Sequence, residues 1–252
     1  MTITTLSDEE LQRYSRQLLM PAFDVPGQLA LRNGRVLVVG AGGLGCPVVL
    51  YLAAAGVGQI TVADPDTIEL ANLQRQVAFT MADLGQPKAE VLCQRAMANN
   101  PDIHCQPVNA RLDAERLPEL VVEADVVVDA SDNFATRFAV NAACVKAGVP
   151  LVSGAAIRAE GQVAVFHPAQ SDGGCYQCLY ASVGEEALSC SEAGVMGPLV
   201  GMIGTTQALE VIKVLSGWGQ SLAGRLLLLD ATHLQWREMR LRADPTCEVC
   251  GH

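Results

Sequence analysis

The chain has 252 residues, half of them hydrophobic, which suits one large α/β domain or two small ones around a buried core. Its formal net charge of −10 and its lack of clustered Lys and Arg exclude a non-specific nucleic-acid surface, because a phosphate backbone is bound by clustered cations. Acidic residues at positions 8–10 and the absence of any run of about eighteen apolar residues argue against a secretory signal and a membrane span, so we expect a cytoplasmic protein.

The first predicted element is a helix over about residues 7–20. Ser7 and Glu10 have the spacing of a capping box, and the apolar residues after them recur at helical intervals. Arg13 and Arg16 are therefore expected to project from this helix, where the simplest interpretation is a solvated face.

Residues 1–150 then alternate between strand and helix patterns. Continuous apolar runs at 36–39, 60–63 and 126–128 are typical of strands buried on both faces. Helical patterns lie between or after them, at about 44–55, 88–99 and 136–147. This βαβ rhythm predicts an α/β fold with a Rossmann-like, doubly wound and mostly parallel sheet.

The pattern changes beyond Pro150. We expect strands at 162–166, 225–230 and 235–242 and a helix at about 198–215. Two Cys pairs bracket this region, so we interpret 1–252 as a single domain, with a nucleotide-binding half at 1–150 and a mixed-sheet half at 151–252.

A glycine-rich loop follows the first strand. The run from Gly40 to Gly45 matches G-x-G-x-x-G and opens a helix, and Asp64 ends the next strand about twenty residues later. Glycines let the backbone approach a phosphate, the helix N-terminus presents free N–H groups, and the acid accepts from a ribose hydroxyl. Gly40, Gly42 and Gly43 are therefore predicted to bind a nucleotide, the alternative being a turn that serves only tight packing. Taken alone, the motif suggests NAD and a dehydrogenase.

Further polar residues follow the predicted strands. They are Asn72, Arg75 and Gln76 beyond the second strand, Lys88 at the start of the next helix, and Asp132 and Asn133 after 126–128. Ligands of open α/β sheets lie at the carboxyl ends of the strands, so these side chains are expected to converge. Cations with an acid that holds Mg²⁺ suit a triphosphate, and hydride transfer needs neither. Each residue also has an ordinary interpretation as a solvated lysine, a helix cap or a surface ion pair.

These motifs, in this order, resemble those of the MoeB/ThiF family of ubiquitin-activating-type adenylyltransferases over essentially the whole chain. The resemblance is carried by 13–17, 40–45, 72–76, Lys88, Asp132-Asn133, 153–158, 190–195, Cys175-x-x-Cys178 and Cys247-x-x-Cys250. It implies ATP contacts from Gly43, Asp64, Asn72, Arg75, Lys88 and Asp132, with Asp64 on the ribose, Arg75 and Lys88 on the phosphates and Asp132 at Mg²⁺. It also implies that Arg16 reaches the nucleotide of a partner subunit, and therefore a homodimer.

The activity that the resemblance implies is ATP-dependent adenylylation of the C-terminal glycine of a small ubiquitin-like sulfur-carrier protein, bound by the 151–252 half, without an enzyme nucleophile. Residues 153–162 look closer to the MoeB branch, which activates a MoaD-like carrier for molybdopterin synthesis. Activation of ThiS or another carrier stays open. A separate sulfurtransferase or cysteine desulfurase is expected to supply the sulfur. The competing hypotheses are an NAD-dependent oxidoreductase and an inactive carrier-binding adaptor.

Nine cysteines in a reducing compartment point to metal ligands, nucleophiles or core residues. The pairs Cys175/Cys178 and Cys247/Cys250 suit Zn²⁺ bound by four thiolates, which leave no open position for catalysis. The alternative is a thioredoxin-like redox pair, which should follow a strand and open a helix.

The remaining cysteines are single. Cys190 matches a family cysteine that can bond covalently to the carrier in the ThiF branch, the alternative being an inert loop thiol. Cys46, Cys93, Cys105 and Cys144 are predicted to be core residues.

Overall fold

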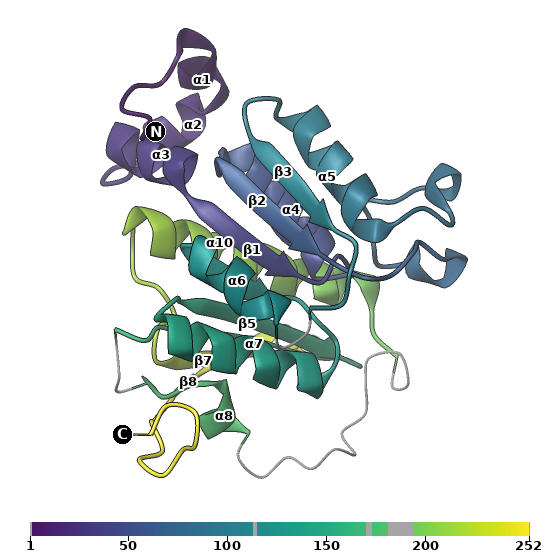
Figure 1. The fold of residues 1–252 in the computed structure, drawn as a ribbon, viewed down its shortest axis with the longest axis vertical. Helices are drawn as coiled ribbons and strands as arrows, with labels where there is room; N and C mark the ends of the chain where they lie inside the picture. Colours follow the sequence, from purple (N-terminus) through teal and green to yellow (C-terminus); the bar gives the residue numbers. More distant parts are fainter. Residues whose placement is uncertain (1, 113–114, 170–172, 181–193, 252) are drawn as a thin grey trace.

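One eight-stranded sheet runs through the protein, in the order β3-β2-β1-β4-β5-β6-β7-β8 (Figure 1). The computed structural model describes residues 2–112, 115–169, 173–180 and 194–251. The strands are β1 (Arg35–Val39), β2 (Gln59–Ala63), β3 (His104–Val108), β4 (Val126–Asp129), β5 (Leu151–Ile157), β6 (Glu160–Phe166), β7 (Arg225–Asp230) and β8 (Gln235–Arg240). The first five are parallel and the last three are added antiparallel, which confirms the predicted fold class.

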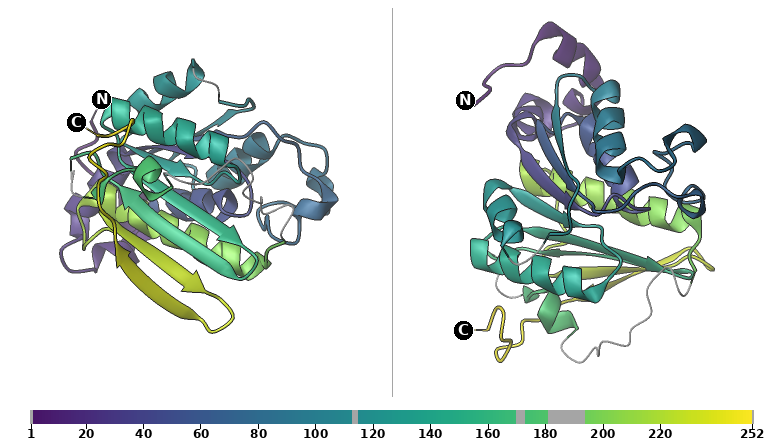
Figure 2. Two further views of the ribbon diagram at one scale, coloured as in Figure 1. Left: turned by 90° about the horizontal axis from the view of Figure 1, so that it is seen from below. Right: turned by 45° about the vertical axis from the view of Figure 1, so that its right-hand side comes forward.

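The helices cover both faces of the parallel part. They are α1 (Asp8–Arg13), α2 (Ser15–Leu18), α3 (Asp24–Asn33), α4 (Gly45–Ala55), α5 (Lys88–Asn99), α6 (Arg116–Glu123), α7 (Phe134–Ala147), α8 (Tyr176–Leu179) and α10 (Gly197–Ser216), with 3₁₀ turns η1 (Leu70–Asn72) and η2 (Met81–Asp83). The contacts place α4, α5 and α10 on one face and α6 and α7 on the other, as the two views of Figure 2 also show.

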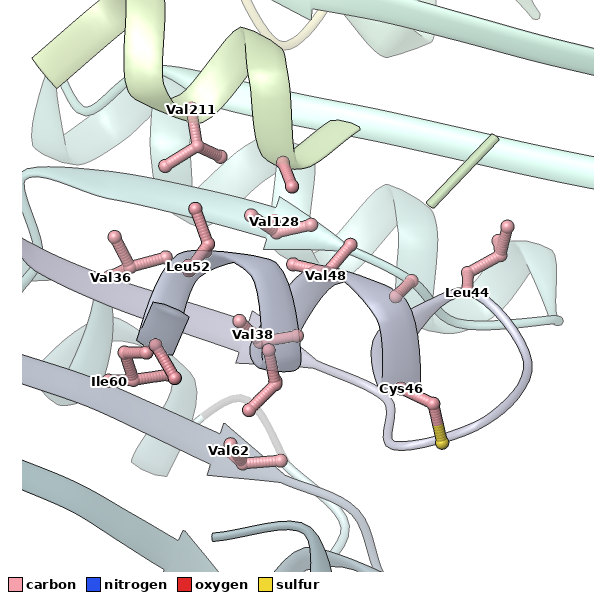
Figure 3. Packing of buried hydrophobic residues seen from close by; sticks show 14 of the residues in the cluster. Val36, Val38, Leu44, Cys46, Val48, Leu52, Ile60, Val62, Val128 and Val211 are labelled. Atoms are coloured by element: carbon pink, nitrogen blue, oxygen red, sulfur yellow. The ribbon is translucent and has the colours of Figure 1, made fainter. Parts of the chain in front are cut away.

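Alternation along the strands divides the core into two layers. Val36 and Val38 of β1 join the cluster under α4, α5 and α10, whereas Leu37 and Val39 join the cluster under α6 and α7. Figure 3 shows the first layer, where Leu52 of α4 lies between the sheet and α10. An apolar run without alternation therefore fits a strand that is covered twice.

The predicted helix over 7–20 is wrong in one respect, because it breaks at Tyr14 into α1 and α2. The capping box of Ser7 and Glu10 forms as predicted. At the break the Tyr14 ring is 1% exposed, its hydroxyl accepts a hydrogen bond of 2.8 Å from Asn100 Nδ2, and it covers Gly56. The ring therefore lies in the core at the point where the helix breaks.

Helix α10 has the length and apolar composition that a membrane span needs. It contacts β4, β5, β6, α3 and α4 instead, and Leu199, Ile203 and Val211 are buried there. Packing inside the protein therefore accounts for its apolar residues.

Candidate active site and four-cysteine site

A cavity of about 600 Å³ opens at the carboxyl ends of β1, β2 and β4. All ten residues predicted to bind the nucleotide line it: Gly40, Gly42, Gly43, Asp64, Asn72, Arg75, Gln76, Lys88, Asp132 and Asn133. Its volume lies within the usual range of small-molecule sites. Segments from four parts of the chain thus meet around one space, as the parallel topology requires.

The glycines of the loop serve two different needs. Gly40 has φ +104°, and a Cβ on Gly45 would lie 1.9 Å from the carbonyl oxygen of Gly40, so packing alone requires these two glycines. A Cβ on Gly42, in contrast, would meet only Gln76 Nε2, at 3.8 Å. Gly42 is therefore left open towards the cavity, and the packing interpretation does not account for it.

Asp64 is buried at the end of β2. Its Oδ2 accepts from the backbone N–H of Ala41 at 2.7 Å, and its Oδ1 accepts from that of Asp66 at 2.8 Å. Burial raises the pKa of Asp64, against these two N–H donors and Lys88. Each carboxylate oxygen keeps a further lone pair for a hydroxyl donor.

Lys88 is a buried cation on the wall of the cavity. Its side chain is 7% exposed, and its Nζ lies 2.8 Å from Oδ2 of Asp66, which is exposed. Arg75 is half-buried and donates from Nη1 to the carbonyl of Ala71 at 3.1 Å. Lys88 is therefore held in place before any ligand arrives, and its ammonium still has protons for a phosphate.

The remaining predicted residues combine structural contacts with access to the cavity. Asn133 caps α7 through a 2.9 Å bond from the Thr136 N–H, and Asn72 Oδ1 accepts from the Glu69 N–H at 3.1 Å. Gln76 is buried, with no hydrogen-bond partner for Oε1 among the described residues. Asp132 is exposed at the start of the same loop as Asn133.

Arg16 does not line this cavity. It is exposed on α2, and Figure 1 shows α1–α3 near the amino end of β1, opposite the cavity. Within one chain Arg16 is therefore away from the other predicted site residues, and its role stays a prediction.

Sequence reasoning missed four charged residues on the cavity wall, Asp66, Glu69, Arg111 and Arg137. Arg137 lines the cavity, its side chain is 7% exposed, and its Nη1 lies 3.6 Å from Oδ2 of Asp129. Asp66, which holds Lys88, also lines it. Spacing in the sequence could have indicated Arg137 and Asp66. Arg137 follows the cap residue Asn133 by one helical turn, and Asp66 follows Asp64 by two residues.

The four paired cysteines come together between α8 and the C-terminal loop, which lie side by side in Figure 1. Their sulfurs all lie within 4.8 Å of one another; the Sγ distances include 3.9 Å for Cys175–Cys178, 3.8 Å for Cys175–Cys247 and 3.4 Å for Cys178–Cys250. Tetrahedral zinc with Zn–S bonds of about 2.3 Å places its sulfurs about 3.8 Å apart. The donor set and its spacing fit that ion.

Hydrogen-bond donors reach three of these sulfurs, although burial raises the pKa of Cys175 and that of Cys250. Asn141 Nδ2 donates to Cys175 Sγ at 3.5 Å, and the Asp244 N–H donates to Cys178 Sγ at 3.4 Å. Although burial raises it, hydrogen bonds from the backbone lower the pKa of Cys247 to about 7. Such N–H···S contacts are the usual support of thiolate ligands.

The single cysteines divide as follows. Cys46, Cys93, Cys105 and Cys144 are buried, as predicted. Burial raises the pKa of Cys46 to about 12, so it is an inert thiol. Cys190, the predicted carrier-linked thiol, lies outside the described residues.

Comparison with known proteins places this site in context. Residues 14–249 match the ThiF family. The chain is 52% identical to the molybdopterin-synthase adenylyltransferase of Escherichia coli K12 over 246 residues, which cover 98% of each chain. It is 46% identical to the sulfur carrier protein ThiS adenylyltransferase of the same organism, over 98% of this chain and 97% of that one. Among solved structures it is similar to E. coli MccB with AMPCPP and MccA, with a TM-score of 0.84, 26% identity, and coverage of 99% of this chain and 75% of that one.

Proposed function

Because the chain belongs to the ThiF family, we propose that it transfers the adenylyl group of ATP to the C-terminal glycine of a small ubiquitin-like sulfur-carrier protein. The observation that carries this proposal is the convergence of the glycine loop, Arg75, Lys88 and Asp132 on one cavity. The relatives named adenylyltransferases support it against the oxidoreductase that the glycine motif alone suggested.

The reaction follows from the charges around the cavity. A carboxylate oxygen of the carrier attacks the α-phosphorus of ATP, a new P–O bond forms, and pyrophosphate leaves with the electrons of the broken P–O bond. Arg75 and Lys88 neutralise the charge on the phosphates, and Asp64 holds the ribose. The product is an acyl-adenylate, which a sulfur nucleophile can attack. No enzyme nucleophile takes part in this scheme.

Asp132 is the residue that would hold Mg²⁺. Its carboxylate is exposed on the cavity wall and is the kind of hard oxygen ligand that Mg²⁺ prefers, together with phosphate oxygens. When bound, the ion neutralises charge on the triphosphate.

The four-cysteine site would hold one structural Zn²⁺. It joins the chain around residues 175–178 to the C-terminal loop and leaves no ligand position for substrate. Its proposed contribution is to the stability of the 151–252 half, which would bind the carrier.

We propose that the carrier is MoaD-like and ends in Gly-Gly, because the chain is 52% identical to the molybdopterin-synthase enzyme and 46% identical to the ThiS enzyme. The proposed pathway is therefore molybdenum cofactor synthesis, in the cytoplasm. A ThiS-like carrier is the second candidate. The proposed assembly is a homodimer in which Arg16 serves the partner subunit's nucleotide, and a separate sulfurtransferase or cysteine desulfurase supplies sulfur.

Pyrophosphate exchange into ATP tests the proposal. The exchange should depend on Mg²⁺ and on a carrier with an intact Gly-Gly end, and it should be faster with a MoaD-like than with a ThiS-like protein. A carrier that lacks its last glycine is the matched control. Exchange that is absent with both carriers would refute adenylylation of a MoaD-like or ThiS-like protein, and a preference for ThiS would refute only the branch.

A further inference from the structure

The loop that carries Asp132 is fixed from the sheet. Asp129 at the end of β4 is fully buried, and its Oδ1 accepts from the backbone N–H of Ser131 at 3.0 Å and from the Ser131 hydroxyl at 2.6 Å. Its Oδ2 accepts from the Ser153 hydroxyl at 3.2 Å. The residue before Asp132 is thus tied to two neighbouring strands.

Arg137 fixes the same loop from the helix side. Its Nη2 donates to the carbonyl of Ser131, while its Nη1 lies 3.6 Å from Asp129 Oδ2. Although burial lowers it, the Asp129 carboxylate raises the pKa of Arg137, so the guanidinium keeps its charge. Ser131 is therefore clamped between a buried acid and a buried cation at the wall of the cavity.

Helix α7 connects the contacts around Ser131 to the four-cysteine site. Asn133, Arg137 and Asn141 follow one another at intervals of four residues and so lie on one face of the helix. Asn141 donates to Cys175 Sγ at 3.5 Å and accepts from the Tyr176 N–H at 2.9 Å. The Tyr176 side chain in turn interacts with the Arg137 guanidinium.

Tyr176 is the residue that links Cys175 to Arg137 on this path. Tyr176 is 1% exposed, and its ring lies edge-on to Phe138 and Phe166, with centroids 5.5 and 6.0 Å away. Because Tyr176 follows Cys175 directly and these aromatic contacts hold its ring, a shift of Cys175 would pass to the Tyr176 side chain and so to Arg137.

We propose that Arg137 is a positioning residue for adenylyl transfer, and that with Tyr176 it couples the Asp132 loop to the four-cysteine site. This rests on the proposed function, in which Asp132 serves the triphosphate. Misplacement of a reacting group by about 1 Å can lower a rate about a hundredfold, so a clamp on the preceding residue affects turnover more than substrate affinity.

Arg137→Lys tests the clamp, because lysine keeps the charge and loses the forked donors. We expect kcat for pyrophosphate exchange to fall about 10- to 100-fold while KM for ATP changes less than about threefold. The matched control is Arg35→Lys, because Arg35 also forms an ion pair with an aspartate. Its partner is Asp125, 2.7 Å away on the surface, at the end of β4 far from the cavity. A kcat for Arg137→Lys equal to that of the control would overturn the proposal, as would a loss that merely follows the unfolded fraction in a melting curve.

Tyr176→Phe tests the coupling without activity, because it keeps the ring and removes only the hydroxyl. Coupling is reciprocal, so a bound nucleotide should slow metal loss from the cysteines. With zinc-loaded protein and a chromogenic chelator, AMPCPP should slow zinc release several-fold in the wild type and have no such effect in Tyr176→Phe. Equal protection in both proteins, or in neither, would overturn the coupling. Wild-type protein without pyrophosphate exchange would refute the proposed function instead.

Discussion

Replacing Gly45 with alanine should destabilise the whole protein. The new Cβ would lie 1.9 Å from the Gly40 oxygen and 2.8 Å from the Gly40 carbonyl carbon, whereas real Cβ contacts are not closer than about 3.0 Å. The Gly40 backbone cannot easily move away, because it packs against Ala130. A Cβ added to Gly40 would lie 2.6 Å from the Ala130 carbonyl oxygen. The loop must therefore move by about 1 Å or more, and we expect the free energy of unfolding to fall by about 3 kcal/mol.

Gly42→Ala is the matched control, because it should leave stability almost unchanged and weaken nucleotide binding. Its Cβ would be 3.8 Å from the nearest atom and would face the cavity, so the free energy of unfolding should change by less than about 1 kcal/mol. The methyl group would occupy space that a phosphate needs, and AMPCPP should bind about 10- to 100-fold more weakly, or by about 1.4 to 2.8 kcal/mol. Urea unfolding followed by circular dichroism and titration calorimetry measure the two quantities. Unchanged affinity in Gly42→Ala, or an unchanged urea midpoint in Gly45→Ala, would refute this division of roles.

Three other outcomes are expected. Asp132→Ala should abolish pyrophosphate exchange with the melting temperature unchanged, because the side chain is exposed; retained exchange would remove it from the metal role. Purified protein should contain about one zinc per chain by elemental analysis, and a chelator should remove it together with cooperative melting. Glu10→Gln should make the free energy of unfolding depend less on pH in acid. Burial raises the pKa of Glu10, but Ser7 and Arg32 together hold it below its ordinary 4.5. The stabilisation from Glu10 is therefore present above about pH 4.5 and is lost as the pH falls through the folded-state pKa. A wild-type advantage that persists well below that pH would contradict the assignment.

Apart from β8, which is exposed at every residue, the strands that could be predicted have continuous apolar runs, because burial leaves that mark in a sequence. β3 and β5 escaped prediction for different reasons. β3 is an edge strand with one buried residue, Cys105, and an internal Pro107. β5 contains Ser153 and Gly154, which have low strand propensity, and a Cβ on Gly154 would lie 2.3 Å from the Gln207 side chain. Gly154 leaves room for the side chain of Gln207 in α10, far along the chain, and no local pattern reports that.

The cavity residues could be predicted because parallel strands bring their carboxyl ends to one edge, so positions along the chain determine which residues meet. The partners of those residues could not. That Lys88 rests against Asp66, and that Arg137 reaches back to Ser131, depends on side-chain directions and burial. The contact of Tyr14 at the helix break belongs to the same class, since its hydrogen-bond partner Asn100 is distant in sequence.

The cavity also depends on the second half of the chain, although every predicted nucleotide residue lies before residue 151. Val200 of α10 packs against Gly43, because a Cβ added to Gly43 would lie 2.9 Å from Val200 Cγ2. The absence of a side chain at Gly204 likewise allows α10 to approach the carbonyl of Leu44. Gln207 Nε2, one turn further, donates to the carbonyl of Asp129 at 2.8 Å. Helix α10 thus presses on the glycine loop and on the strand end that carries the Asp132 loop. Residues 1–150 alone would expose the apolar face of α4 and leave the glycine loop without this support, so nucleotide binding and the second half should be lost together.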